Sequence, residues 1–176
     1  MLVPSFYPLV GGAERQLSGL LPFLRERGVQ PFVLTRRLPG MPSIERQNGF
    51  QVVRTWASGH TLSFFLSSLG YLARHQSDWD IIHVHTADSP ALVGATASWF
   101  WRKPLLVKIP SRGPGTALDR YSRSRWGKVR FRYLRKFIDG FIIVNSTMSS
   151  DLLKMGVPGG RVYPIPNGVD VEKFQP

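Results

Sequence analysis

Apolar runs of strand length alternate along this chain with stretches in which apolar residues recur every three or four positions. The period-two and continuous apolar runs predict strands at 2–6, 30–35, 50–55, 80–85, 105–109, 140–145 and 161–165. The other pattern predicts helices at 13–27, 62–74, 90–101, 125–138 and 148–155. Because strands and helices alternate, we expect a mainly parallel sheet of about seven strands with crossover helices on both faces.

A glycine and a proline bear on the first predicted helix. Gly28 follows it where a C-terminal stop belongs, and Pro22 lies inside it. We expect Pro22 to kink this helix or to move its start downstream, because proline lacks the N–H that helix bonding needs.

Composition excludes several classes of protein. The chain has 176 residues, 43% of them hydrophobic, and its apolar runs are all shorter than the roughly 20 residues that span a bilayer. No basic, apolar and small-residue leader opens it, so we expect no signal peptide. It contains no cysteine, which removes disulfides and thiolate metal sites and agrees with a cytoplasmic location.

The net charge of +12 is concentrated in one segment. Residues 112–136 hold nine basic side chains and one acidic one. A local basic patch of this size implies an anionic partner, namely lipid headgroups, nucleic acid or a phosphorylated substrate.

The same segment has a helical apolar stripe at Trp126, Val129, Tyr133 and Phe137. A basic amphipathic helix with aromatic residues is typical of peripheral attachment to an anionic membrane surface. An ordinary crossover helix with a solvated basic face explains the pattern about equally well. Nucleic acid is the weaker alternative, because no nucleic-acid-binding module is visible. The candidate membrane patch comprises Arg125, Trp126, Lys128, Arg130, Arg132, Arg135 and Lys136.

Ligands of open parallel sheets bind outside the carboxyl ends of the strands. Gly11 and Gly12 follow the first predicted strand and precede a helix, a geometry that suits a phosphate or carboxylate, although a tight turn has the same signature. Glu14 then lies in the first helical turn, where the helix dipole favours an acid. The pattern is not G-x-G-x-x-G, so a dinucleotide site is not predicted.

Two histidines share one face of the strand at 80–85, by period-two alternation. A metal is the less favoured interpretation of His83 and His85, because Asp88 is the one further candidate ligand nearby, and we expect none. His83 suits a supporting role inside the strand, whereas His85 at its end can reach a ligand. After the next strand, Lys108 with Arg112 either binds an anionic group or reaches solvent.

Several of these segments together resemble one family. VYPIPNGVDVEKFQP resembles the junction between the two halves of GT-B glycosyltransferases of the GT4, or group 1, kind. FYPLVGGAER is similar to the glycine loop of that family, IIHVHTADSPA to its HxH strand, and GFIIVNSTMSSDLLKMGVP to a later segment. Two features depart from it: the first strand is about five residues shorter than usual, and Lys108-Ile109-Pro110 replaces a T-x-H pattern.

The resemblance implies a Rossmann-like three-layer α/β/α sandwich, the N-terminal half of a GT-B fold. It implies an acceptor-side domain over 1–168, the start of an inter-domain linker over 169–176, and a donor-binding domain outside this chain. The implied enzyme is a retaining glycosyltransferase of the hexosyltransferase kind. It moves a sugar from a nucleoside-diphosphate sugar to an acceptor hydroxyl, with lipid-linked molecules and polysaccharide precursors as candidate acceptors.

The resemblance also implies roles for particular residues. The diphosphate and the acceptor lie at the glycine loop, the sugar and the acceptor at the end of the HxH strand, and an anionic acceptor at the basic residues that follow. The residues concerned are Gly11, Gly12, Glu14, His85, Thr86, Lys108 and Arg112. The nucleotide sugar is a substrate, so we expect no cofactor and no metal, and we expect this chain alone to be inactive.

An alternative from another class is a non-catalytic Rossmann-like module that binds an anionic ligand or a membrane surface. The expected location is cytoplasmic in either case, with attachment at the inner face of the cell membrane if the basic helix binds lipid.

Overall fold

The computed structural model describes residues 1–9, 11–58 and 61–168 of the chain. The predicted linker at 169–176 lies outside the described residues.

A four-stranded parallel sheet forms one part of the fold. Its strands are β4 (Ile82–Val84), β5 (Leu105–Ile109), β6 (Gly140–Ile143) and β7 (Val162–Pro164), paired in that order. These strands are the continuous apolar runs of the sequence, and most of their residues are buried because helices cover the sheet. The predicted parallel α/β architecture is therefore confirmed.

A three-stranded part adjoins it, in the order β1 (Phe32–Arg36), β3 (Phe50–Thr55) and β2 (Ile44–Gln47). β1 and β3 are parallel, whereas β2 is antiparallel to β3 and was not predicted. Asn48 and Gly49 form the turn between β2 and β3, with φ values of 47° and 83°. An Asn-Gly pair between short strands is a hairpin signal, so the sequence did contain the information for β2.

The predicted strand at 2–6 is wrong in extent. Only Leu2 pairs, as an isolated parallel bridge to Leu34 on one side and to Val84 on the other. Its N–H donates to the His83 carbonyl at 2.8 Å, and its own carbonyl accepts from the His85 N–H at 2.9 Å. Pro4 has no N–H with which to extend this ladder. The continuous parallel sheet is therefore four strands wide, smaller than the seven predicted, and Leu2 joins it to the other three.

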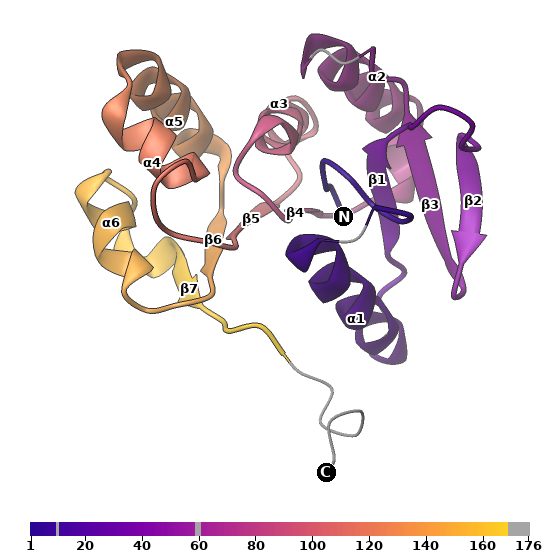
Figure 1. Cartoon of the computed structure of the whole chain (residues 1–176), viewed down its shortest axis with the longest axis horizontal. Coiled ribbons are helices and arrows are strands. Elements are labelled where there is room, and N and C mark those ends of the chain that lie inside the picture. Colours follow the sequence, from indigo (N-terminus) through magenta and orange to yellow (C-terminus); the bar gives the residue numbers. More distant parts are fainter. Residues whose placement is uncertain (10, 59–60, 169–176) are drawn as a thin grey trace.

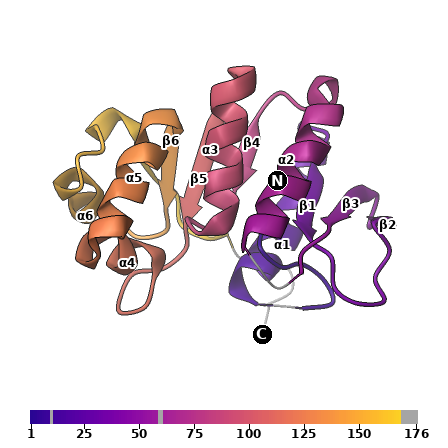
Figure 2. The same cartoon turned by 90° about the horizontal axis from the view of Figure 1, so that it is seen from above.

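Helices cover both faces (Figures 1 and 2). α2 (Thr61–Arg74), α3 (Ser89–Trp101), α5 (Arg125–Phe137) and α6 (Met148–Lys154) lie on one face, where their buried side chains share one core, and α1 (Gly12–Glu26) lies on the other. A further helix, α4 (Ala117–Arg123), precedes α5, and short 3₁₀ turns occur at Gln76–Asp78 and Gly159–Arg161. None of the described helices is both long and apolar enough to cross a membrane.

α1 starts at Gly12 and continues through Pro22, so the proline does not move its start downstream. Leu17 and Leu21 are fully buried and anchor this helix against Val33 and Val52 on the sheet. The apolar contact of its inner face outweighs the one backbone hydrogen bond that Pro22 removes.

The larger core lies between the sheet and the layer of α2, α3, α5 and α6, and it includes Phe64, Leu105, Phe141 and Leu152. Gly94 allows α3 to approach the sheet closely, because a Cβ there would lie 2.8 Å from Leu105 Cδ1 and 2.9 Å from Val84 Cγ2. This packing fixes the position of α3, whose first turn borders the candidate site.

Candidate functional site at the carboxyl edge of the sheet

His85 lies directly after β4 and is 1% exposed. Its ring is 4.3 Å from the ring of His83, and neither of its nitrogens has a hydrogen-bond partner among the described residues. Burial, together with charge repulsion from His83, the N-terminal ammonium and Lys108, lowers the pKa of His85 to about 2. His85 is therefore a neutral imidazole at neutral pH, and it can offer a hydrogen bond to an uncharged or anionic ligand.

Lys108 is the neighbour of His85 on the adjacent strand. Val84 pairs with Val107, so His85 and Lys108 lie one position beyond the last pair, at the same level of the sheet. Lys108 is 7% exposed, and within the described parts of the chain its ammonium forms neither a hydrogen bond nor an ion pair. Burial lowers the pKa of Lys108. An ammonium without a counter-ion at the end of a largely buried side chain favours the approach of an anion.

Arg112, the other predicted anion-binding residue, is already paired. Its Nε lies 2.7 Å from Asp151 Oδ2, and a second guanidinium nitrogen donates to Asp151 Oδ1 at 3.3 Å. This bidentate contact ties the β5–α4 loop to α6. The sequence analysis gave Lys108 and Arg112 the same role. The structure distinguishes them, because Arg112 has a carboxylate partner and Lys108 has none among the described residues.

The glycine loop leaves the sheet beside His85, because Leu2 is bonded to that residue. At its other end, Glu14 accepts a hydrogen bond from the Gly11 N–H at 3.0 Å and one from Ser5 Oγ at 2.6 Å. Glu14 is 9% exposed and is not the surface acid that a dipole argument alone describes. Its carboxylate fixes the loop and caps α1. A Cβ at Gly11 would lie 2.7 Å from Glu14 Oε2, so a larger residue there would displace the Glu14 carboxylate.

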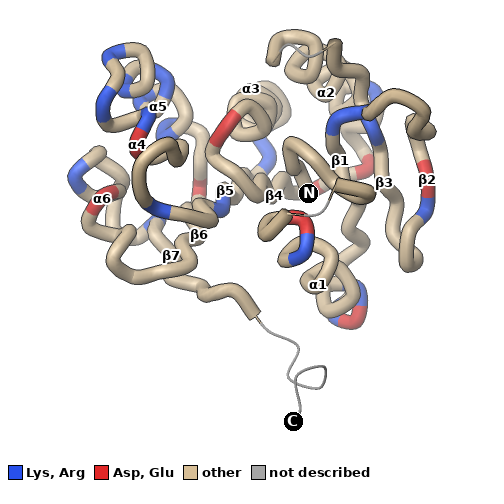
Figure 3. Tube along the Cα trace, in the orientation of Figure 1, with Lys and Arg blue, Asp and Glu red and all other residues tan. Residues whose placement is uncertain are grey.

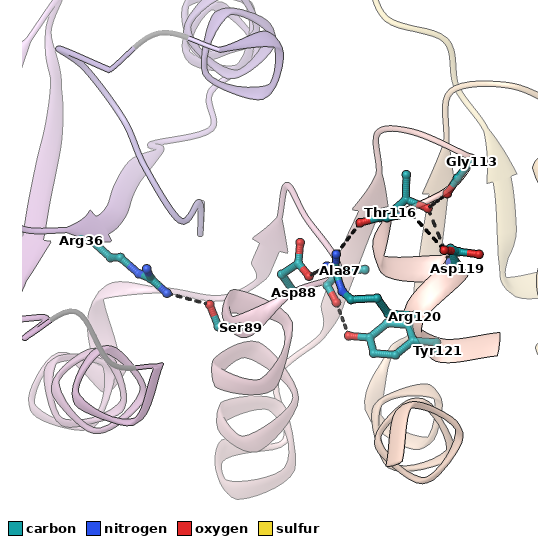
Figure 4. Close-up of polar contacts among 10 residues, drawn as sticks. Arg36, Ala87, Asp88, Ser89, Gly113, Thr116, Asp119, Arg120 and Tyr121 are labelled. Carbon is teal, nitrogen blue, oxygen red and sulfur yellow. Dashed lines mark hydrogen bonds and ion pairs between the residues drawn. The ribbon is translucent and has the colours of Figure 1, made fainter. Parts of the chain in front are cut away.

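The β4–α3 turn borders a cavity of about 360 Å³. Asp88 forms an ion pair with Arg120 of α4, and Tyr121 donates its hydroxyl to the Ala87 carbonyl (Figure 4). Asp88 therefore pairs with Arg120. This ion pair occupies the carboxylate that was the third candidate ligand for a metal at His83 and His85. Thr86, whose Oγ1 is buried and has no partner in the described chain, also lines this cavity.

Arg36 is a residue of this edge that the sequence analysis did not single out. It ends β1, donates to Ser89 Oγ at 3.1 Å, and lies 5.1 Å from the centroid of the Phe64 ring (Figure 4). The signal that could have identified it is its position at the carboxyl end of a strand. Its guanidinium holds β1 to the first turn of α3.

The residues of the predicted basic patch on α5 fall into an exposed group and a half-buried group. Arg125, Trp126, Lys128, Arg132 and Lys136 are exposed, and Trp126, at 82%, is the most exposed large apolar side chain of the described residues. Arg130 and Arg135 are half-buried: the first packs over Tyr121, and the second donates to the carbonyls of Met155 and Gly156. These two arginines therefore secure α5 to its neighbours and are not free surface charges.

An open parallel sheet with helices on both faces and ligand-binding groups at its carboxyl edge defines the class of Rossmann-like enzyme domains. The chain belongs to one family within that class. The model of Glycosyltransferase Family 4 matches residues 10–173.

The relatives agree with this assignment. A 2-deoxystreptamine N-acetyl-D-glucosaminyltransferase from Niallia circulans is 26% identical over 117 residues, which cover 57% of this chain and 30% of the relative. The HepE protein of Anabaena, solved in complex with UDP and glucose, superposes with a TM-score of 0.69 and 20% identity over 97% of this chain and 44% of its own. A sucrose-phosphate synthase chain from Thermosynechococcus elongatus gives a TM-score of 0.68 and 16% identity, covering 99% and 93% of the two chains.

The chain thus spans less than half the length of the Niallia and Anabaena proteins. The solved neighbours are GT-B glycosyltransferases, and the predicted family and fold class are confirmed. The predicted domain boundaries and the roles of the site residues stay predictions.

Proposed function

We propose that this chain is the acceptor-side domain of a retaining glycosyltransferase that moves a sugar from a nucleoside-diphosphate sugar to an acceptor hydroxyl. The observation that carries the proposal is His85, a buried neutral imidazole without a partner in the described chain, beside unpaired Lys108 at the carboxyl edge. Family membership supports the reaction class, and the UDP and glucose named for the Anabaena neighbour support a nucleotide-sugar donor.

In this proposal His85 and Thr86 donate hydrogen bonds to hydroxyls of the sugar and the acceptor. A neutral imidazole is suited to this role, because it donates from one nitrogen without adding a positive charge to the site. Gly11 and Gly12 bring the start of α1 to the diphosphate or the acceptor, which the helix amides beyond Gly11 face. Glu14 acts through Gly11, whose N–H it holds, and is a positioning residue.

We assign the anionic group of the acceptor to Lys108 rather than Arg112. The carboxylate of Asp151 already neutralises Arg112 with good bidentate geometry. Lys108 has no counter-ion among the described residues, so an acceptor phosphate or carboxylate would compensate the cost of its burial. Acceptors of this kind include lipid-linked and polysaccharide-precursor molecules.

The test compares three variants of the two-domain enzyme, with UDP-glucose as the first donor probe. His85→Ala should lower kcat by about 100-fold or more while circular dichroism stays unchanged, since oriented donors typically contribute factors of this size. Lys108→Met should raise the KM for an anionic acceptor, and Arg112→Met, the matched control, should affect it far less. Unchanged turnover in His85→Ala would contradict the proposal.

We also propose peripheral attachment to an anionic membrane surface through α5. Four exposed basic residues on this helix support it, together with the exposed indole of Trp126. Each basic residue near an anionic bilayer contributes about 1 kcal/mol, so four suffice for reversible binding.

A further inference from the structure

Arg54 is a charged residue at a buried position of the sheet. It is the next-to-last residue of β3, and its side chain is 2% exposed. Arg54 follows Val52 by two positions, so both side chains lie on the face of β3 that packs against α1. Its terminal nitrogen Nη1 is buried and has no hydrogen-bond partner among the described residues. A charge at such a position is unusual, because buried faces of strands are normally filled by apolar side chains.

The other terminal nitrogen of Arg54, Nη2, makes two contacts. It donates to the carbonyl of Tyr7 at 2.8 Å and lies 2.6 Å from Glu45 Oε1. Glu45 pairs with Val52 across the strands and is therefore the diagonal neighbour of Arg54 on the same face. β2 forms the edge of this part of the sheet, and Glu45 is its one acidic residue (Figure 3). The β2–β3 hairpin thus reaches the glycine loop through one guanidinium.

The stretch of the glycine loop that Arg54 contacts has little support from side chains. Phe6 is buried, whereas Tyr7 and Leu9 are 56% and 51% exposed. Glu14 binds both ends of the loop, and the hydrogen bond from Arg54 adds a constraint between these ends. Because the acceptor is a backbone carbonyl, this bond fixes the path of the chain.

Stability alone is a weak explanation for this buried ion pair. Desolvation of two charges offsets most of their attraction, so replacement of such a pair by apolar residues of similar size is often neutral or stabilising. Arg54 also buries one nitrogen without a partner in the described chain, which adds to the cost. The geometry of the pair therefore serves the position of the loop better than it serves the stability of the fold.

We infer that Arg54, oriented by Glu45, is a positioning residue for glycosyl transfer: it holds the Tyr7 carbonyl and thereby sets where the glycine loop meets the substrate. The inference rests on the proposed function, which places the diphosphate or the acceptor at this loop. Arg54 is covered and acts through the backbone of Tyr7. The carboxylate of Glu45 fixes the guanidinium by a charge-assisted hydrogen bond. A shift of about 1 Å in a substrate-positioning group can lower turnover by up to about 100-fold.

A spin label on the loop tests the positional claim directly. The chain contains no cysteine, so Leu9→Cys provides a single labelling site at an exposed position. In the 176-residue chain, Arg54→Met should increase the mobility of the label in the EPR spectrum, and Arg54→Lys, which keeps a donor, should increase it less. Arg135→Met is the matched control, because Arg135 also donates to backbone carbonyls, but between α5 and the turn after α6. It should destabilise the chain and leave the mobility of the label unchanged.

A double variant, Arg54→Met with Glu45→Met, separates loop position from stability. Both charges are removed together, so urea unfolding should give a free energy close to that of the parent. The label on the loop should nevertheless be as mobile as in Arg54→Met alone. In the two-domain enzyme, both the single and the double variant should lower kcat/KM for UDP-glucose by about 10-fold or more.

Two results would overturn the inference. Unchanged label mobility in the double variant would show that the loop keeps its position without this arginine. A mobile loop with unchanged kcat/KM would show that transfer does not depend on the position of the loop. The label requires no donor, so it decides the positional claim whichever sugar the enzyme transfers. Failure of the proposed function looks different: turnover would persist in His85→Ala and fall in the Arg54 variants.

Discussion

At the scale of single residues, burial decides the chemistry of this edge. His83 and His85 are two of the four histidines of the chain, and their rings contact each other. Burial is the main cause that lowers their pKa values from 6.5 to about 3 and about 2. Charge repulsion from the N-terminal ammonium and Lys108 acts in the same direction.

These pKa values predict a loss of stability in mild acid. The unfolded chain binds protons at these histidines near pH 6.5, whereas the folded chain does so only near pH 3 and pH 2. The free energy of unfolding should therefore be unaffected above pH 6.5 and fall as the pH decreases below it, by about 1.4 kcal/mol per pH unit for each histidine. Urea unfolding between pH 7 and pH 5 measures this.

The variant His85→Gln should remove about half of that pH dependence, even if it changes the stability at pH 7. His75→Gln is the control, because His75 is exposed on the surface beside Asp78. An identical pH slope in the parent and in His85→Gln would show that the folded chain takes up a proton at His85 in the same pH range as the unfolded chain. The pKa of His85 would then not be lowered by folding.

At the scale of elements, local contacts explain where α4 begins and how closely α5 packs against it. α4 begins where Thr116 Oγ1 accepts from the Asp119 N–H, and Asp119 in turn accepts from the Gly115 N–H at 2.9 Å. A Cβ at Gly127 would overlap the carbonyl oxygen of Arg120 and lie 2.9 Å from the Tyr121 Cα. α5 can therefore follow α4 this tightly only because residue 127 is glycine.

Two glycine substitutions should therefore have opposite effects. Gly127→Ala should destabilise the chain by about 1–3 kcal/mol, because overlap with backbone outweighs the better helix propensity of alanine. Gly19→Ala in α1 should stabilise it by up to about 1 kcal/mol, because nothing lies within 4 Å of the added methyl group. Thermal and urea unfolding compare them, and stabilisation in both variants would contradict the α4–α5 contact.

At the scale of the whole molecule, the candidate site lies open at the edge of the sheet. The cavity at the β4–α3 turn is about 360 Å³ and is lined by that turn, the end of β5, the β5–α4 loop and α4. This chain covers 44% of the Anabaena neighbour. A catalytic arrangement needs its groups held together, which one edge alone does not provide.

The chain alone should accordingly bind UDP-glucose weakly, with a Kd of about 1 mM or higher, and transfer no sugar. Calorimetry with UDP-glucose, and product analysis after long incubation with an acceptor mixture, measure these two properties. Sugar transfer by the 176 residues that disappears in His85→Ala would show that this chain is a complete enzyme.

Local patterns in the sequence were sufficient to predict most helices and strands and to identify the family. The apolar runs at β3, β5 and β6, the helical stripes of α2 and α5, and the glycine loop are local signals, since each depends on neighbours in the chain. β2 and α4 also had local signals, in Asn48–Gly49 and in Thr116 with Asp119, which the sequence analysis did not use. The short first strand could not be judged locally, because only pairing with β1 and β4 shows that Leu2 bridges them.

Tertiary packing decided what the candidate residues can do. The sequence analysis gave Lys108 and Arg112 the same role. Only the fold brings Asp151 of α6 to Arg112 and places Lys108 beside His85. It also treated the α5 arginines alike, whereas contacts with Tyr121 and Gly156 occupy Arg130 and Arg135. A sequence determines periodicity and capping through neighbours in the chain. Ion pairs, burial and pKa values depend on residues that are distant in sequence, and only the folded chain brings those together.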